Sequence, residues 1–441
     1  MSVSRVGVVG AGTMGRGIAQ IAALGGYETV LYDPLPGVAT QSAEALRQAL
    51  EKGAARGRWS EKDAAAAAQR VQPAEDVEQM AGAELAIEAA PERLELKREI
   101  FNQLAEVLGP EATLASNTSS LRVSEIAEGV PQPERVVGMH FFNPPPLMKL
   151  VEIVATERSS EQALAAATEV GERMGRTPIR AKDSPGFVAN RLARPFSLES
   201  LRILGDGVAD AATIDRIVRL GGGFRMGPFE LLDLIGLDVN LEIARSFFAQ
   251  SGEVERWRPS PIQEQLVAEG KLGRKSGHGY HDYSEGSHRE SDPDLGIDAP
   301  VLDPDQLAKI DPVAEQVLPR LIAQIANEAA FAQEEQIGSP EDMDTAMKLG
   351  FNWPLGPVEF TELIGACRAV GLLEGLEREK GAAYEPAPRL QAEADEHAKS
   401  VGPETLGNAA ALKEGLRANP PDKAWSRELK ELRSHLKAET D

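Results

Sequence analysis

Residues 6–33 read VGVVGAGTMGRGIAQIAALGGYETVLYD, and this stretch decides the fold of the first part of the chain. The apolar run Val6–Val9 is followed by GAGTMG at residues 10–15, which fits the pattern G-x-G-x-x-G, and by a helix predicted over Met14–Leu24. A second strand is predicted over Thr29–Tyr32, and it ends at Asp33. This order of strand, glycine turn, helix and strand predicts a Rossmann-type domain that binds a dinucleotide.

Each glycine of the motif is expected to have its own task. Gly10 permits the tight turn, Gly12 lets the backbone approach the pyrophosphate, and Gly15 lets the helix pack close to the strand. The helix N-terminus favours the phosphate charge. Asp33 lies near the spacing of a ribose-binding acid, and its carboxylate would repel a 2′-phosphate, so NAD is favoured over NADP. The alternative is a glycine-rich turn followed by a surface aspartate.

The composition limits the possible partners. There are 69 acidic and 47 basic residues, and the formal net charge of −22 disfavours nucleic acid or an anionic membrane. Any polyanionic substrate must therefore meet a local basic patch. The single cysteine, Cys367, leaves no intrachain disulfide, and neither a charged leader nor an apolar run of membrane-spanning length is present. We expect a soluble cytoplasmic protein.

Further strands are predicted over Leu85–Glu88, Thr113–Ala115 and Arg135–Met139, and helical patterns take over from about Asp183. Strands that alternate with helices predict a parallel, doubly wound sheet. We therefore assign residues 1–184 to an NAD-binding α/β domain.

The helical part contains an internal repeat. Residues 215–236 read DRIVRLGGGFRMGPFELLDLIG and residues 344–365 read DTAMKLGFNWPLGPVEFTELIG, at an offset of 129 residues. Upstream, Arg191 and Arg320 keep the same register. Many identities in one register indicate two duplicated helical units.

We expect the first helical unit over 185–283 and a linker rich in Ser, Gly, Asp and Pro over 284–311. Residues 312–441 would contain the second helical unit followed by a polar, partly helical tail on the surface. Pro319 stands in the second unit where Asn190 stands in the first. The second helical unit is therefore predicted to have a structural role and not to form a second active site.

The two helical units are expected to pair through an intramolecular pseudo-twofold axis. The apolar face of Leu231, Leu234 and Ile235 would otherwise be exposed, and large apolar patches seek partners.

A histidine and a glutamate are expected to meet in a hairpin. His140 follows the apolar run Val136–Met139, three prolines force a turn, and Leu150–Val154 is a further strand. A hairpin centred near Pro146 places His140 opposite Glu152. The glutamate could then hold one imidazole nitrogen while the other accepts a proton from an alcohol. A structural His–Glu hydrogen bond remains the alternative.

Other polar residues have two interpretations each. Ser116-Asn117-Thr118-Ser119-Ser120 could cap a helix or place donors at the ligand-binding edge of the sheet. Asn190 could be a helix cap or a ligand contact. His278, His281 and His288 could suggest a metal, but their irregular spacing favours a solvated loop, and no metal is expected.

Several stretches together resemble the L-3-hydroxyacyl-CoA dehydrogenase family over most of the chain. They are GAGTMG (10–15), AIEAAPERLELK (86–97), LASNTSSL (114–121), HFFNPPPLMKLVEIV (140–154), KDSPGFVANR (182–191), MGPFELLDLIG (226–236) and KLGRKSGHGY (271–280). The resemblance implies that His140 is the catalytic base with Glu152 as its acidic partner, and that Ser119 and Asn190 contact the substrate.

The resemblance and the glycine motif together also assign cofactor and CoA contacts. The NAD contacts would be Gly10, Gly12, Thr13, Met14, Gly15, Asp33, Glu92, Lys97, Asn117, Ser119, Asn143 and Lys275. A CoA-contacting lysine of the family matches Arg56, whereas a CoA-contacting serine matches Ala49, which puts that contact in doubt. Lys52, Arg56 and Arg58 could form the basic patch, or could simply be a solvated helix end.

The resemblance implies a Rossmann-type domain followed by two all-α domains of the 6-phosphogluconate dehydrogenase C-terminal-like type. The implied reaction is the NAD-dependent oxidation of (S)-3-hydroxyacyl-CoA to 3-oxoacyl-CoA, as in β-oxidation, 3-hydroxybutyryl-CoA or phenylacetate metabolism. A pseudo-dimeric monomer or a homodimer is expected. The alternatives are a sugar-acid dehydrogenase of the L-gulonate type and a non-enzymatic, crystallin-like binding protein.

Overall fold

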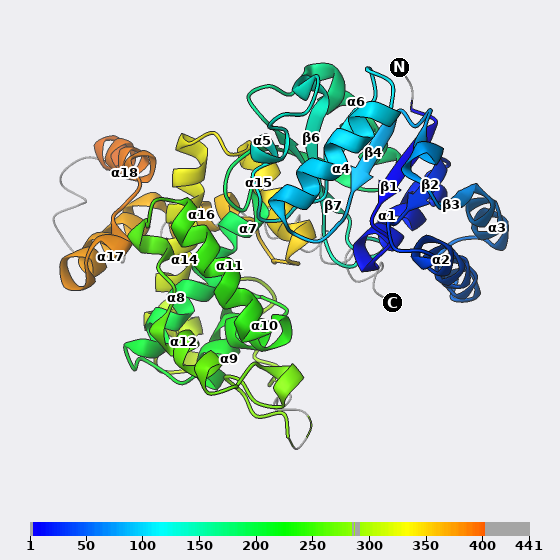
Figure 1. Ribbon diagram of the computed structural model, residues 1–441. Coiled ribbons are helices and arrows are strands. Elements are labelled where there is room, and N and C mark those ends of the chain that lie inside the picture. Colours follow the sequence, from blue (N-terminus) through cyan, green and yellow to red (C-terminus); the bar gives the residue numbers. More distant parts are fainter. Residues whose placement is uncertain (1–2, 285, 287–291, 402–441) are drawn as a thin grey trace. The chain divides into compact units, whose positions relative to one another are not determined.

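A computed structural model describes residues 3–284, 286 and 292–401 of the chain. Its strands are β1 (Arg5–Val9), β2 (Glu28–Tyr32), β3 (Val71–Ala74), β4 (Leu85–Glu88), β5 (Thr113–Ser116), β6 (Val136–Phe141), β7 (Leu150–Ala155) and β8 (Thr177–Lys182). They form one eight-stranded sheet in the order β3-β2-β1-β4-β5-β6-β7-β8 (Figure 1). Only β6 and β7 pair antiparallel. The predicted doubly wound α/β fold is confirmed.

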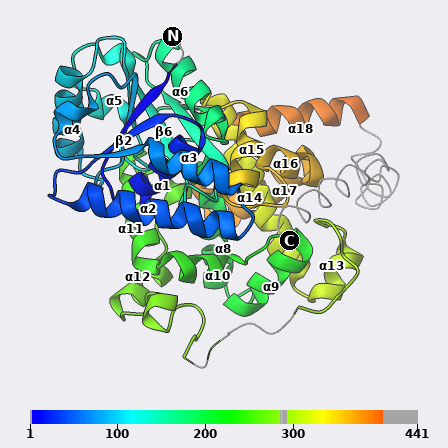
Figure 2. The ribbon, with the colours of Figure 1, turned by 90° about the vertical axis from the view of Figure 1, so that its right-hand side faces the viewer.

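One face of the sheet is covered by four helices. The helices α1 (Thr13–Leu24), α2 (Val38–Ala55) and α3 (Glu61–Arg70) pack side by side (Figure 2), and α6 (Glu161–Arg173) contacts β5 to β8. Their apolar residues share one core with alternate residues of the strands, among them Val6, Val8, Met139 and Phe141. Because successive strand residues point to opposite faces, His140 points away from this core.

The sequence analysis missed the two edge strands, and both lack a continuous apolar run. The strand β3 contains Gln72 and Pro73, and proline is tolerated in a sheet mainly at its edge. The strand β8 alternates buried residues with exposed ones, such as Arg180 and Lys182. An edge strand needs to bury little, so its sequence carries little signal.

Beyond Lys182 the described residues form helices joined by loops and turns, and no strand is found among them. The further helices are α4 (Leu94–Val107), α5 (Val123–Ile126), α7 (Ala189–Leu192), α8 (Arg194–Gly205), α9 (Ala211–Gly222), α10 (Pro228–Ile235), α11 (Leu237–Gln250), α12 (Pro261–Ala268), α13 (Pro304–Ile310), α14 (Ala314–Glu334), α15 (Pro340–Gly350), α16 (Pro357–Ile364), α17 (Ala366–Lys380) and α18 (Pro388–Val401). None of the described helices is both long and apolar enough to cross a membrane.

The chain divides into two compact units that do not follow the linear order. The first runs up to Arg194 and adds Val239–Pro259 and Ala332–Val358. The second contains Pro195–Asp238, Ser260–Phe331 and the described residues from Glu359 onward. Each unit therefore contains segments of both helical repeats. The linear boundaries expected from the sequence remain a proposal.

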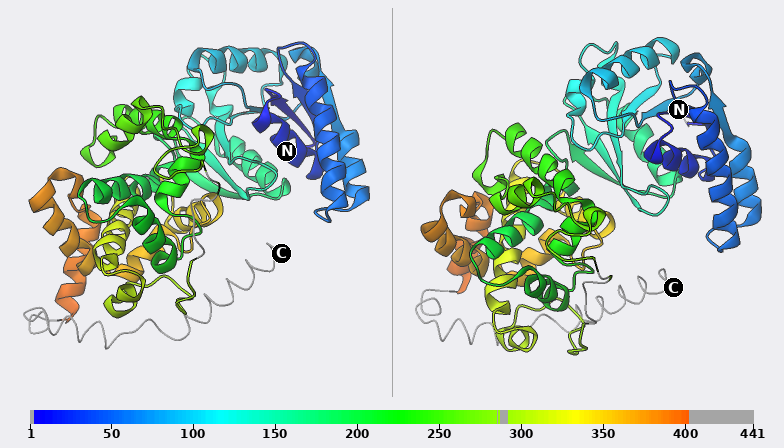
Figure 3. Two further views of the ribbon diagram at one scale, coloured as in Figure 1. Left: turned by 90° about the horizontal axis from the view of Figure 1, so that it is seen from below. Right: turned by 60° about the horizontal axis from the view of Figure 1, so that its bottom comes forward.

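The repeat is visible helix by helix. At the offset of 129 residues, α9 corresponds to α15, α10 to α16, and α11 to α17. The break between α7 and α8 has no counterpart, because α14 continues through Pro319 as one helix. Figure 3 shows α17 and α18, in orange, packed against each other.

Two ion pairs connect the repeats reciprocally. In the first compact unit, the Arg191 guanidinium donates two hydrogen bonds to the Glu335 carboxylate, at 2.7 and 2.8 Å. In the second unit Arg320 donates to Asp206 at 2.7 Å. Arg320 and Glu335 follow Arg191 and Asp206 by the same 129 residues. In a twofold interface, each residue contacts the equivalent of the residue that its own counterpart contacts. Arg191 with Glu335 and Arg320 with Asp206 follow this pattern.

The face that was expected to be covered by this pairing is exposed. Leu234 is 50% and Ile235 is 39% exposed, so the prediction that they pack against the second repeat is wrong. Their counterparts Leu363 and Ile364 are half-buried and buried. The contacts between the repeats include the ion pairs described above, which an apolar pattern does not reveal, and the stacked rings of Phe224 and Phe360, 5.5 Å apart.

Three segments expected to lie at the surface are partly buried. His281 does not lie in a solvated loop, because its Nε2 contacts the buried Asp215 at 2.7 Å. Helix α13 lies inside the expected linker, with Leu307 and Ile310 buried. The start of the tail is helical as expected but not confined to the surface, since Tyr384 is buried. His288 and residues 402–441 lie outside the described residues.

We expect Arg320→Ala to destabilise the protein strongly. Arg320 bonds both Glu199, which is fully buried, and Asp206, so its removal leaves a buried carboxylate that has lost a cationic partner. The expected loss of unfolding free energy is about 3–5 kcal/mol. Arg216→Ala is the matched control: its ion pair with Asp311 is partly exposed, and removing it should cost below about 1 kcal/mol. Denaturant titration would measure both; equal losses would contradict the prediction.

Candidate active site

The glycine-rich loop has the geometry that its sequence predicts. Gly10 has a φ of +93°, and a Cβ there would lie 2.7 Å from the carbonyl oxygen of Ala89. A Cβ at Gly15 would lie 1.7 Å from the carbonyl oxygen of Gly10, so helix and loop pack too closely for any side chain. A Cβ at Gly12 would meet no atom within 4 Å. Gly12 is therefore the one glycine of the three that faces open space.

Asp33 lies at the end of β2 and holds this loop. Its carboxylate accepts hydrogen bonds from the backbone N–H of Ala11 at 2.9 Å and of Leu35 at 3.0 Å. The loop and the acid are thus fixed relative to each other at the carboxyl edge of the sheet. This is where doubly wound proteins bind dinucleotides.

Glu92 gathers the polar residues that follow β5. Its carboxylate accepts hydrogen bonds from the backbone N–H of Ser119 and Ser120 and from the hydroxyl of Thr118. Burial alone would raise the pKa of Glu92, but the Lys97 charge and these hydrogen bonds outweigh it, so the pKa lies below its ordinary value. The serine cluster belongs to a fixed turn, and neither Ser120 nor Ser124 caps the next helix.

Lys97 is buried beneath this turn, with only 1% of its surface exposed. Its ammonium lies 2.7 Å from the Glu88 carboxylate, 3.2 Å from the Glu92 carboxylate and 3.3 Å from the carbonyl oxygen of Ala90. Two of these contacts, with Glu88 and Ala90, are hydrogen bonds, and the third is an ion pair with Glu92. The geometry fits a residue that orients Glu92 better than one that contacts NAD directly.

The remaining cofactor candidates of the first unit differ in exposure. Ser119 and Asn143 are exposed, whereas Asn117 is half-buried and its Oδ1 accepts the backbone N–H of Phe141 at 2.9 Å. Asn117 therefore ties the end of β5 to the strand that carries His140. Its contribution to NAD binding remains a prediction.

His140 and Glu152 occupy paired positions in the hairpin, as predicted. The register of β6 and β7 pairs His140 with Glu152, and the imidazole Nδ1 lies 2.6 Å from Glu152 Oε2. Both side chains are buried, at 8% and 0% exposure. The aromatic rings of Phe142 and Phe187 lie 4.7 and 5.8 Å from the imidazole centroid.

The other oxygen of Glu152 is held by the start of α7. Glu152 Oε1 accepts the backbone N–H of Val188 at 3.0 Å and of Ala189 at 2.9 Å. Three hydrogen-bonding partners thus satisfy the carboxylate. An ionised Glu152 needs a proton on Nδ1 of His140, and Nε2 of the neutral ring is then left as an acceptor.

Comparison with known proteins agrees with this arrangement. The family model described as "3-hydroxyacyl-CoA dehydrogenase, NAD binding domain" matches residues 5–184, and the C-terminal domain of the same family matches residues 186–283 and 317–402. The chain belongs to the 3-hydroxyacyl-CoA dehydrogenase family. Its cofactor is NAD, and its reaction is the NAD-dependent oxidation of a 3-hydroxyacyl-CoA. Both predictions from the sequence are confirmed.

Relatives within the family include both long and short chains. The 3-hydroxyadipyl-CoA dehydrogenase of Escherichia coli (strain K12) is 34% identical over 89% of this chain and 97% of its own length. The crystal structure of 3-hydroxybutyryl-CoA dehydrogenase from E. coli K12 has a TM-score of 0.83 at 33% identity, covering 91% of this chain and 100% of that one. A probable 3-hydroxybutyryl-CoA dehydrogenase of Bacillus subtilis (strain 168) is 38% identical over 65% of this chain and 99% of its own length.

The residues around Gly12 fit NAD, the cofactor of the family. The open space at Gly12 and the start of α1 without a side-chain cap are what a pyrophosphate requires. The Asp33 carboxylate lies beside this loop, where a ribose hydroxyl of NAD would donate to it. Among the described residues, no group of three His, Cys, Asp or Glu side chains could hold a metal ion.

The remaining predicted contacts are Lys275 and the basic residues near the end of α2, and their roles stay predictions. Lys275 belongs to the second unit, where its ammonium contacts Asp238 at 2.5 and 2.6 Å. Lys52, Arg56 and Arg58 lie at the end of α2 and beyond it, are exposed, and have no side-chain hydrogen bond or ion pair with the described residues. The half-buried Ala49 lies one turn before them.

Sequence reasoning missed the two backbone donors of Val188 and Ala189. Backbone groups carry no residue signature, so only the motif KDSPGFVANR around them could have drawn attention to this segment. The same motif contains a second missed contact: the carboxylate of Asp183 accepts the backbone N–H of Val123 and Ser124, both at 2.8 Å. These bonds cap α5, which the serine cluster does not.

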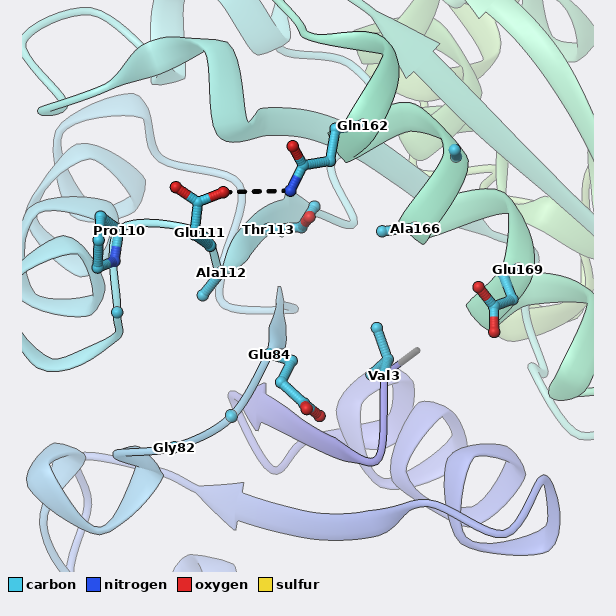
Figure 4. A pocket seen from close by; sticks show the side chains of 13 residues that line it. Val3, Gly82, Glu84, Pro110, Glu111, Ala112, Thr113, Gln162, Ala166 and Glu169 are labelled. Atoms are coloured by element: carbon cyan, nitrogen blue, oxygen red, sulfur yellow. Dashed lines mark hydrogen bonds between the residues drawn. The ribbon is translucent and has the colours of Figure 1, made fainter. Parts of the chain in front are cut away.

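A cavity of about 430 Å³ lies at the other edge of the sheet. Its lining includes Val3, Glu84 and Thr113, which lie at or just before the starts of parallel strands (Figure 4). Gln162 donates to Glu111 across part of it at 3.2 Å. The cavity therefore lies away from the carboxyl edge that carries the glycine loop and His140.

The contrast between two glycines gives a test of the cofactor loop. Gly12→Ala should weaken NAD binding while leaving the melting temperature unchanged, because its Cβ meets no protein atom but narrows the approach of the pyrophosphate. Gly15→Ala is the matched control and should lower the melting temperature, because its Cβ overlaps the Gly10 carbonyl. Calorimetric titration with NAD and thermal unfolding would measure both. Normal NAD affinity in Gly12→Ala would contradict the assignment.

Proposed function

We propose that His140 is the general base of the reaction and receives the hydroxyl proton of the (S)-3-hydroxyacyl-CoA at Nε2. NAD, when bound, supplies the hydride acceptor. The observation that carries this proposal is the double anchoring of Glu152, by the imidazole on one oxygen and by two backbone N–H groups on the other. The anchored carboxylate fixes both the ring orientation and the nitrogen that is free to accept.

Glu152 also stabilises the product of the proton transfer. When His140 gains a proton, the imidazolium lies 2.6 Å from a buried carboxylate. The opposite charges attract at this distance, so the carboxylate offsets the positive charge that the proton transfer creates. In the reverse direction the same imidazolium would return the proton to the oxygen of a 3-oxoacyl-CoA.

Ser119 and Asn190 are proposed to contact the substrate oxygens. Ser119 is exposed beyond the end of β5, and its backbone is held by Glu92. Asn190 is half-buried in α7, next to the amides that hold Glu152. Helix α7 would thus serve both the base and the substrate.

The cofactor and CoA contacts form a second part of the proposal. NAD would be held by Gly10–Gly15, Asp33, Glu92, Lys97, Asn117, Ser119 and Asn143, and Lys275 is likewise proposed as an NAD contact. Lys52 and Arg56 would meet the phosphates of CoA. Their exposure and lack of described partners support this role, since the protein is acidic and unpaired cations are the expected sites for a polyanion.

The substrate is proposed to have a short acyl chain. Two of the relatives that this chain matches over about nine-tenths of its length are named for 3-hydroxyadipyl-CoA and 3-hydroxybutyryl-CoA. Comparing kcat/KM over 3-hydroxyacyl-CoA substrates of increasing length tests this point; a maximum at long chains would contradict it.

We also propose a cytoplasmic enzyme in which the two helical repeats pair within one chain. The single cysteine, which needs no oxidising compartment, supports the location. The reciprocal Arg191–Glu335 and Arg320–Asp206 pairs support the internal pairing. Sedimentation would establish whether any further dimer forms.

His140→Gln should lower kcat by about 10²–10⁴-fold and leave the affinity for NAD nearly unchanged. Glutamine cannot accept a full proton, whereas the residues proposed to hold NAD remain in place. The assay is the reduction of acetoacetyl-CoA by NADH, followed by loss of NADH absorbance. Near-normal turnover of the variant would remove His140 from the mechanism, and an inactive wild type would remove the proposed reaction itself.

A further inference from the structure

The end of α14, in the second helical repeat, makes a bidentate ion pair with the helix that anchors Glu152. Arg191 of α7 donates two hydrogen bonds to Glu335, at 2.7 and 2.8 Å. Arg191 is buried, at 2% exposure, and its guanidinium lies 5.1 Å from the ring centroid of Trp257. A paired, planar guanidinium has little freedom, so this contact fixes α7 closely.

The residues that follow Glu335 contact both the end of β8 and the residue that precedes α7. The backbone N–H of Lys182 donates to the carbonyl oxygen of Ile337 at 2.8 Å, and its ammonium donates to that of Glu335 at 3.0 Å. A Cβ at Gly338 would lie 3.1 Å from the side chain of Val188. The second repeat therefore touches one of the two residues whose N–H groups hold Glu152.

Helix α15 extends this contact to the strands of the hairpin. It packs against α7, β7 and β8. Just beyond its end, the ring of Phe351 lies 6.2 Å from that of Phe142, which lies 4.7 Å from the imidazole of His140. All of these residues belong to the first compact unit, so the contacts form one continuous packing.

We propose that Glu335 is a positioning residue for the His140–Glu152 pair, acting through Arg191 and α7. The inference rests on the roles proposed for His140 and Glu152. Fixing α7 keeps the N–H groups of Val188 and Ala189 aimed at Glu152, and this in turn keeps the imidazole in place. The second repeat, which lacks the asparagine, then contributes to catalysis without forming a second site.

The charge of Glu335 supports this role. The hydrogen bonds from Arg191 hold the pKa of Glu335 below its ordinary value, so the carboxylate is ionised near neutral pH. The guanidinium of Arg256 lies 3.9 Å from the same carboxylate and 4.4 Å from the Trp257 ring centroid. Two guanidinium groups thus contact a single half-exposed carboxylate, and both of them also lie over the Trp257 ring.

The repeat itself provides a matched control. Asp206 occupies the position of Glu335 in the first repeat and pairs with Arg320 as Glu335 pairs with Arg191. Asp206 lies in the second unit and is not among the residues proposed to bind or react. Asp206→Asn therefore removes an equivalent ion pair without touching α7.

The experiment compares Glu335→Gln, Glu335→Asp and Asp206→Asn with the wild type. Glu335→Gln should lower the single-turnover rate about 10- to 100-fold, as expected for a small misplacement of catalytic groups, with the KM for NAD within about 2-fold. Glu335→Asp keeps the charge and should recover part of the loss. Asp206→Asn should keep its single-turnover rate within about 2-fold of the wild type, even if its melting temperature falls as far as that of Glu335→Gln.

A second readout does not depend on activity. Hydrogen exchange of the Val188 and Ala189 amides should be at least about 10-fold faster in Glu335→Gln, and unchanged in Asp206→Asn. The proposal would be overturned if Glu335→Gln kept the amide exchange and the single-turnover rate of the wild type. It would also be overturned if Glu335→Gln and Asp206→Asn lost the same fraction of that rate. If the wild type fails to turn over 3-hydroxyacyl-CoA, the proposed function fails, whereas faster exchange still supports the positioning contact.

Discussion

The buried carboxylate of Glu152 is the constraint on which the site depends. A charge without access to water is tolerated only when hydrogen bonds replace its hydration. Here the partners come from two places: the imidazole across the hairpin and the N–H groups at the start of α7. The strand and the helix must therefore meet at one point, and the same contact aligns the imidazole that is proposed to receive the substrate proton.

The features that follow from short-range rules could be predicted from the sequence. The hairpin register followed from the spacing of His140 and Glu152 about Pro146, and the glycine loop followed from the distinct requirements of Gly10, Gly12 and Gly15. Residues that are consecutive in the chain carry both signals. The family resemblance then supplied the reaction, which the comparisons confirm.

What could not be predicted depends on contacts between distant segments. Gln72 and Pro73 disguise an edge strand, and His281 looks solvated until Asp215 is brought against it. The pairing of the repeats was expected through Leu234 and Ile235, which are exposed, whereas the observed contacts include ion pairs and the stacked rings of Phe224 and Phe360. An arginine in a sequence does not indicate which carboxylate it will meet, or whether it will be buried. One of these unpredicted contacts, the Arg191–Glu335 ion pair, also connects the second repeat to α7.

The tautomer of His140 tests the central role of Glu152 most directly. In protein labelled with ¹⁵N-histidine, with the His140 signals assigned from their loss in a His140 variant, the neutral ring should carry its proton on Nδ1 and leave Nε2 bare. The two nitrogen chemical shifts distinguish these states at a pH where the ring is neutral. A proton on Nε2 would contradict the proposed mechanism, because the ring could then accept no proton from the substrate at that nitrogen.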